Sequence, residues 1–410
     1  MSLRQVVPNL HLGRLYSLDY IVGGVLLYTL STSLFMYYLP QSLCWLLDLV
    51  GLLFTFYGFK IRKKKLNIDR DLKFCMFFMF IWGGWILLIS MLDNEFNIPH
   101  IITQPSYVLP LLLPIFLFLN IHPNELRIIY NYLYVGCFCV FLHLILHFKD
   151  FVLDTSNTFA NFHQFADVGD DELGFYFYLA STTVATLFLI PMAIFYVSGS
   201  IPNLTQKVVI VIAMILSIIT TMSFGRRGSS VMILAIFALQ FILYVGWRSK
   251  HKFVFFLLSF IIVIIIGIYF YKFIDLFPIL SKRLEEDTRS NVEQDFWNST
   301  TLESFIFGKG LHGTYRSNYM NRGLIETGYL YIILQKGVLY LIPYVYLIIV
   351  SAVRGLFLGK SIFVKGLGLF LLFELCLLYP GGNPSWGLQH FVLYLSISIC
   401  GCHRWRSMNI

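Results

Sequence analysis

Long apolar runs separated by short polar segments dominate the chain, and residues 253–271 form one unbroken example. An α-helix needs about 20 apolar residues to cross the hydrocarbon core of a membrane. A transmembrane β-barrel would instead show alternating segments of about ten residues. The pattern therefore predicts an all-α polytopic membrane protein with about twelve transmembrane helices. We expect spans near residues 18–39, 43–60, 74–92, 101–119, 128–148, 175–197, 207–225, 228–246, 253–271, 326–350, 361–379 and 388–402.

The composition excludes a soluble enzyme and a protein with a single membrane anchor. Of 410 residues, 58% are hydrophobic and 13% are charged, whereas soluble domains have about 45–50% and about 25%. The mean hydropathy is +0.73, a value that one span could not produce in a chain of this length. We expect residues 1–410 to form a single integral membrane domain. Residues 272–325, the longest hydrophilic stretch, should form a large outer (periplasmic) loop that caps the helix bundle.

Basic residues gather at the ends of the apolar runs and set the expected orientation. The net charge is +8, and the main basic segments are 60–65, 247–252, 354–360 and 403–406. Lys and Arg accumulate in short cytoplasmic loops of membrane proteins. All four segments fall on one side of a twelve-span arrangement with both termini cytoplasmic. The partner implied is therefore the lipid bilayer, and no nucleic acid is expected.

The chain contains no phosphate-binding loop of the GxxxxGK[ST] type, so chemistry driven by ATP is not expected. His143 and His147 have the helical spacing of metal ligands, but the sequence offers no third ligand beside them. We therefore predict no metal and no cofactor.

Two adjacent arginines, Arg226 and Arg227, lie between two predicted spans on the side expected to be outer, against the positive-inside bias. In one reading they belong to a tight hairpin and extend to lipid phosphates. In the other they form an anion site, because guanidinium groups match phosphate oxygens and the neighbouring glycines and serines supply backbone N–H groups. A pyrophosphate head group at the membrane surface would suit such a site.

Glu326 lies where the polar loop returns to an apolar span. A carboxylate there is favoured by the dipole at a helix N-terminus. It is equally suited to act as a general base. The residues alone leave both interpretations open.

The order of motifs in residues 207–350 resembles the bacterial O-antigen polymerase and O-antigen ligase family. The resemblance rests on the arginine-glycine turn, on Arg289 followed by an aromatic pair at 296–297, and on the Phe-Gly-Lys-Gly turn at 307–310. A polar residue then starts a span of the form x-x-x-Tyr-Leu at 326–330, and Gly337 follows. Ligases of the family usually have a His-Asn pair where Glu326 and Thr327 stand. Polymerases more often tolerate an acid there, so the polymerase is favoured.

The resemblance implies a membrane glycosyltransferase that polymerises oligosaccharide repeat units linked to undecaprenyl pyrophosphate, at the outer face of the bacterial inner membrane. In such an enzyme of lipopolysaccharide biosynthesis, Arg227 with Arg226 and Arg289 would bind the pyrophosphate. Glu326 would accept a proton from the attacking hydroxyl.

Three further residues of the outer loop are candidates to contact the sugars: Trp297 and Tyr315 by stacking, and His312 by lining a groove. A partner protein that regulates chain length is possible for a polymerase. The alternatives are an O-antigen ligase that transfers glycan to the lipid A core, and, from another class, a flippase for the lipid-linked glycan. The flippase is less favoured because the chain shows no matching halves.

Overall fold

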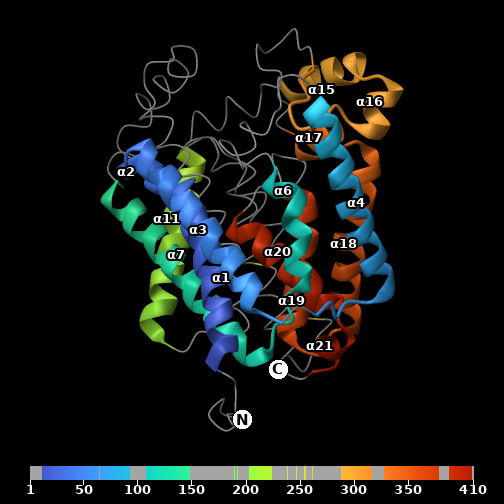
Figure 1. The fold of residues 1–410 in the computed structure, drawn as a ribbon. Helices are drawn as coiled ribbons and strands as arrows, with labels where there is room; N and C mark the ends of the chain where they lie inside the picture. Colours follow the sequence, from blue (N-terminus) through green and yellow to red (C-terminus); the bar gives the residue numbers. More distant parts are fainter. Residues whose placement is uncertain are drawn as a thin grey trace.

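Helices make up all the regular structure of the described residues, and they pack side by side in a bundle (Figure 1). The computed structural model describes residues 12–63, 65–92, 108–147, 203–223, 288–315, 327–377 and 387–408, with a few isolated positions between them.

Four of the described helices are long and apolar enough to cross a membrane. At 1.5 Å per residue, their 21 to 24 residues extend over about 32–36 Å, which matches a hydrocarbon core of about 30 Å. The described fold is thus all-helical and compatible with a membrane-embedded protein. The four segments are Gln41–Ile61, Arg70–Leu92, Pro123–Leu146 and Val338–Leu358.

The first helices, α1 (Leu12–Ser31) and α3 (Gln41–Ile61), pack backbone to backbone and are joined through the short α2 (Phe35–Tyr38). A Cβ atom added at Gly24 would lie only 2.4 Å from the carbonyl oxygen of Gly51. Small residues let helices approach closely where lipid provides no hydrophobic drive for association. Glycine at these two positions therefore fixes the α1–α3 contact.

Five further helices fall on predicted spans. They are α4 (Arg70–Leu92), α7 (Leu126–Leu146), α11 (Leu204–Ser223), α19 (Ile362–Leu377) and α20 (Leu388–Cys400). The predicted spans at 175–197, 228–246 and 253–271 lie outside the described residues, apart from isolated positions. The total of twelve spans consequently remains a prediction.

The predicted span at 101–119 is irregular in its described part. Helix α6 (Leu109–Leu112) continues as a 3₁₀ helix, η2 (Leu113–Phe118), and the two contain Pro110 and Pro114. Proline lacks the N–H that an α-helix needs and clashes with the preceding turn. The apolar run is therefore continuous in sequence, but it forms a short helix that changes its geometry.

The expectation of one continuous span at 326–350 is wrong. The chain forms α17 (Gly328–Lys336), breaks at Gly337 and continues as α18 (Val338–Val353). Gly337 has a φ of 73°, in the left-handed region that glycine enters without steric penalty. At nine residues, α17 is only about 14 Å long, too short to cross the membrane alone.

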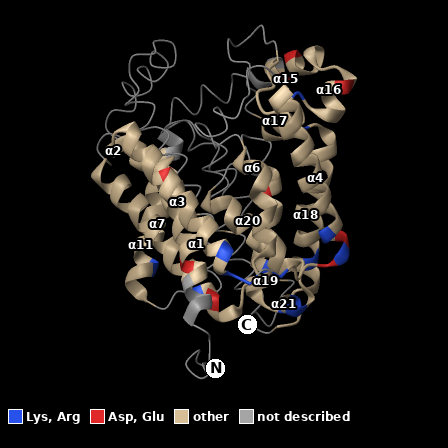
Figure 2. Ribbon diagram, in the orientation of Figure 1, with Lys and Arg blue, Asp and Glu red and all other residues tan. Residues whose placement is uncertain are grey.

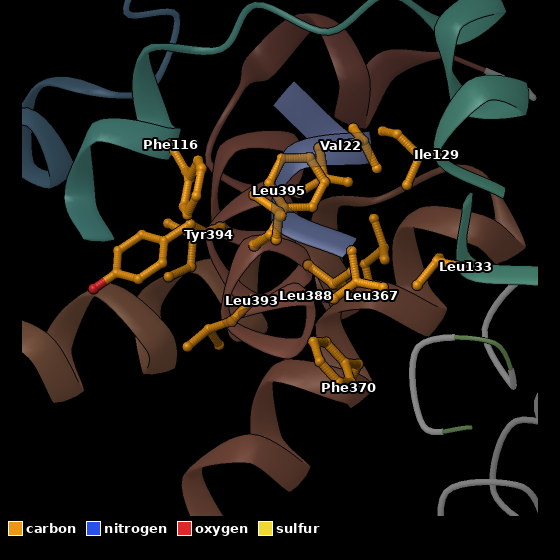
Figure 3. Close-up of a cluster of buried hydrophobic side chains, with 14 of the residues drawn as sticks. Val22, Phe116, Ile129, Leu133, Leu367, Phe370, Leu388, Leu393, Tyr394 and Leu395 are labelled. Carbon is orange, nitrogen blue, oxygen red and sulfur yellow. The ribbon is translucent and has the colours of Figure 1, made fainter. Parts of the chain in front are cut away.

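Helix α20 lies at the centre of the described bundle. Its residues are buried on every face, and it packs against α1, α18, α19 and η2. In Figure 3, Tyr394 and Leu395 of α20 lie close to Phe116 of η2 and Val22 of α1. A helix that is hydrophobic all round belongs in the core of a bundle.

Basic residues concentrate at the end of the bundle where α1 begins and the short α21 (His403–Ser407) ends (Figure 2). We call this the basic end; it contains residues 60–73, 354–360 and 403–406. Three of the four basic segments found in the sequence meet here, whereas residues 247–252 lie outside the described residues.

Ion pairs tie the basic end together. Asp69 forms ion pairs with Arg354 at 3.0 Å and with Arg406 at 2.9 Å, and Asp71 pairs with Arg354 at 2.8 Å. A separate pair, Arg62–Glu125, is almost completely buried at 2.8 Å. The Asp69–Arg406 pair joins the start of α4 to the C-terminal helix α21. The Arg62–Glu125 pair joins the end of α3 to the start of α7.

The described part of the predicted outer loop of residues 272–325 contains two helices. They are α15 (Thr288–Ser299) and α16 (Leu302–Phe307), and both lie at the end of the bundle opposite the basic end (Figure 1). Thr301 caps α16, since its side chain accepts a hydrogen bond from the Ser304 N–H.

Candidate functional site

The candidate site is the α15–α17 region at the end opposite the basic end. Arg226, Arg227 and Glu326, to which the sequence assigns the main chemistry, lie outside the described residues. Arg289 lies in the first turn of α15, and Trp297 lies in its last turn. The remaining candidates, His312 and Tyr315, follow α16.

A small hydrophobic cluster holds α15 against α17. Its centre is Phe296, which is completely buried and contacts the ring of Tyr315 edge-on, with centroids 5.7 Å apart. Leu330, Ile333 and Leu334 of α17 complete the cluster with Val292.

The two residues predicted to stack on sugars, Trp297 and Tyr315, differ in their exposure to solvent. Trp297 is 49% exposed, whereas Tyr315 is only 5% exposed and belongs to the cluster. In this structure Trp297 therefore presents an accessible ring, and Tyr315 anchors the segment that follows α16.

A hydrogen bond joins α15 to the start of α17. The Thr327 hydroxyl donates to Glu293 Oε1 at 3.2 Å. Glu293 lies one helical turn after Arg289 in α15, and Thr327 directly follows Glu326 in the chain. The structure thus brings the helix that carries Arg289 to the residue next to Glu326, although these residues are far apart in sequence.

The Phe-Gly-Lys-Gly turn caps the C-terminus of α17. The Lys309 N–H donates to the Leu334 carbonyl oxygen at 2.7 Å, and the Gly310 N–H donates to Gln335 at 3.1 Å. The last carbonyl groups of a helix have no partner within it, so they need such donors when buried. A Cβ atom at Gly308, where φ is 79°, would lie 2.5 Å from the Gln335 oxygen.

Gly337, where the helix breaks, also packs against the start of this turn. A Cβ atom there would lie 2.1 Å from the Ile306 carbonyl oxygen. The indole N–H of Trp82 in α4 donates to the Lys336 oxygen at 2.8 Å, and its ring stacks on Phe307. The helix break is therefore a fixed junction of α4, α16, α17 and α18.

The segment after this turn is held equally firmly. The Leu311 N–H donates to the Ser90 hydroxyl at 2.8 Å, and its carbonyl oxygen accepts from Gln335 Nε2 at 2.8 Å. His312, the next residue, is half-buried. Its backbone position is thus set by α4 and α17.

Buried ionisable side chains also lie at the end of α17 and within α19. Lys336 is 2% exposed, and its ammonium lies 4.8 Å from the centre of the Tyr340 ring. Glu374 accepts two hydrogen bonds from Gln389 Nε2, at 2.9 and 3.0 Å. The available signal was an ionisable residue within an apolar run, which is costly in a membrane unless it has a partner.

Chemically, this region combines an exposed aromatic ring and a helix bearing an arginine with a rigid support of glycines and capped carbonyl groups. In the part of the chain that the structure describes, no group of three His, Cys, Asp or Glu side chains is placed to hold a metal ion. The chain matches no protein-family model, no curated protein and no solved structure.

Proposed function

We propose that the protein is a membrane glycosyltransferase that polymerises undecaprenyl-pyrophosphate-linked oligosaccharide repeat units at the outer face of the bacterial inner membrane. The observation that carries this proposal is the Thr327–Glu293 hydrogen bond, supported by the Phe296 cluster. Together they dock the helix that carries Arg289 onto the point where α17 follows Glu326. A cationic pyrophosphate site beside a general base would need these two segments to be adjacent, and their docking supports the proposal.

In the proposed reaction, a sugar hydroxyl of the incoming repeat unit attacks the anomeric carbon at the reducing end of the growing glycan. A new glycosidic C–O bond forms as the C–O bond to the pyrophosphate breaks. Undecaprenyl pyrophosphate leaves with the electron pair, and the Glu326 carboxylate takes the hydroxyl proton. Arg226, Arg227 and Arg289 stabilise the charge that develops on the leaving group.

The proposal needs no nucleotide, because the energy of the transferred bond is already stored in the lipid-linked substrate. It includes twelve spans with both termini cytoplasmic. The common position of the start of α1 and the end of α21 agrees with that topology (Figure 1). The exposed Trp297 is the ring proposed to stack on sugar, and a regulator of chain length is the proposed protein partner.

The test is complementation of a deletion strain of the source bacterium with site variants. Arg227→Ala and Glu326→Gln should abolish long surface glycan chains on a gel, while immunoblots show normal protein in the membrane. Glu303→Gln, in the exposed first turn of α16, and Arg70→Ala, at the basic end, are matched controls that should keep the ladder. Normal ladders in both site variants would contradict the assignment.

The deletion strain also separates the related functions. Loss of a polymerase leaves lipid A core with a single repeat unit, whereas loss of a ligase leaves bare core and accumulated lipid-linked polymer. A flippase would show no extension of chains by the purified protein in detergent, where no second compartment exists.

A further inference from the structure

A small pocket opens at the basic end, far from the candidate site. It has a volume of about 90 Å³ and forms where three segments meet: the α3–α4 connection, the entrance to α7, and the C-terminal helix α21. That volume holds several water molecules. It also suits one compact polar group, but not a nucleotide.

The polar side chains that line the pocket come from Asn67, Asn120, His122 and Arg404. Asn67 Nδ2 donates to Asn120 Oδ1 at 3.0 Å, which holds the two amides side by side. The Arg404 side chain is exposed and forms no ion pair with any described residue. Neither Asp nor Glu is found among the described residues of the lining.

Two carboxylates in the segments that line the pocket, Glu125 and Asp69, are already paired with arginines. Glu125, whose side chain is completely buried, bonds to Arg62 at 2.8 Å. Asp69 bonds to both Arg354 and Arg406. These acids therefore offer no counter-ion to Arg404.

Two lysines add positive charge beside the pocket. The Lys65 N–H bonds to the carbonyl oxygen of Phe118, two residues before Asn120, at 3.2 Å. The Lys360 N–H bonds to the Arg406 oxygen in α21 at 3.0 Å. Both residues are exposed, and their positive charges belong to the segments that surround the pocket.

The remaining wall is apolar and includes Trp405 and Met408. A pocket with cationic donors on one side and an apolar wall on the other, at the end of a helix bundle, fits the boundary between water and lipid. Basic pockets between transmembrane helices at the cytoplasmic face bind anionic lipid head groups.

We infer that this pocket binds a phosphate group, held by the Arg404 guanidinium and the neighbouring amides, from an anionic phospholipid of the adjacent leaflet or from free phosphate. The guanidinium supplies paired N–H donors that match phosphate oxygens. The inference is independent of the proposed glycosyl transfer, because no residue of the candidate site takes part.

The test measures dissociation constants by calorimetry on the full-length protein purified in a neutral detergent. The probes are inorganic phosphate, short-chain phosphatidylglycerol, and short-chain phosphatidylcholine, whose head group has no net charge. Arg404→Gln should weaken binding of the preferred anion by about tenfold, the effect of one charge-assisted hydrogen bond. Lys60→Gln removes the same charge from an exposed residue of α3 outside the pocket, and it should leave the constant within about twofold.

Selective binding of phosphatidylglycerol would identify the lipid as the source, and binding of inorganic phosphate with equal strength would identify the free ion. The inference is overturned if the unmodified protein binds neither anion. It is also overturned if Arg404→Gln and Lys60→Gln weaken binding equally, since that would indicate a diffuse surface attraction. Arg404 is exposed, so the melting temperature of its variant should match that of the unmodified protein.

Discussion

The indole N–H of Trp82 donates a hydrogen bond to the backbone carbonyl oxygen of Lys336, 254 residues later in the chain, over 2.8 Å. The bond ties the middle of α4 to the break between α17 and α18. It also satisfies a carbonyl group that the ended helix leaves without a partner.

Trp82→Phe should destabilise the protein by about 1–3 kcal/mol, because it keeps a ring against Phe307 and leaves the buried Lys336 oxygen without a donor. The measurement is thermal unfolding of the purified protein in detergent. Trp85→Phe, on the same helix with a ring that is 43% exposed, is the control and should change little. Equal effects of the two substitutions would show that the hydrogen bond contributes nothing specific.

Gly337→Ala should prevent normal folding. Its φ of 73° alone costs an L-residue about 1–2 kcal/mol, and the added Cβ would lie 2.1 Å from the Ile306 oxygen. Membrane yield and the elution profile of the purified protein report the result. Gly84→Ala is the matched control, since a Cβ there meets nothing within 4 Å; a normal profile for both variants would argue against the observed break.

Glu125→Gln should cost about 3–5 kcal/mol, because it leaves the Arg62 guanidinium buried without its counter-ion. Adding Arg62→Met removes the uncompensated charge and should recover most of the lost stability. Melting temperatures of the two single variants and the double variant form the cycle. Strictly additive losses would mean that the two residues act independently.

Thr327→Val removes the hydroxyl that donates to Glu293 and keeps the shape of the side chain. We expect shorter surface glycans at unchanged protein levels, with a loss of stability of only about 1 kcal/mol. Thr314→Val, on an exposed residue of the same region, should leave the glycans unchanged. If the Thr327→Val variant gave the same glycan ladder as the unmodified protein, the docking of α15 by this hydrogen bond would not be needed for activity.

Among the described residues, hydropathy located the long apolar helices but not their interruptions. Pro110 and Pro114 lie in the apolar run at 101–119, yet the run is continuous in hydropathy and predicts one span. The break at Gly337 depends on a contact with residues 306–308. Such tertiary contacts do not change the hydrophobic periodicity of the sequence, so the periodicity cannot reveal them.

The sequence also did not predict that α20 lies at the centre of the bundle. Its apolar residues resemble those of any lipid-facing span, because lipid and a protein core select similar side chains. At the candidate site, motif order indicated the Phe-Gly-Lys-Gly turn and Gly337 separately. The structure shows that they are two halves of one junction.

The Lys336 junction also has a consequence for biosynthesis. The ribosome delivers α4 early, but the groups that complete its polar contacts, Leu311 and Lys336, emerge more than two hundred residues later. Since chains fold progressively from the N-terminus, Trp82 and Ser90 must wait in the membrane without these partners. In the nascent protein, the Trp82 indole N–H and the Ser90 hydroxyl therefore lack these partners until the later residues are synthesised. A chain truncated before Leu311 would never supply them.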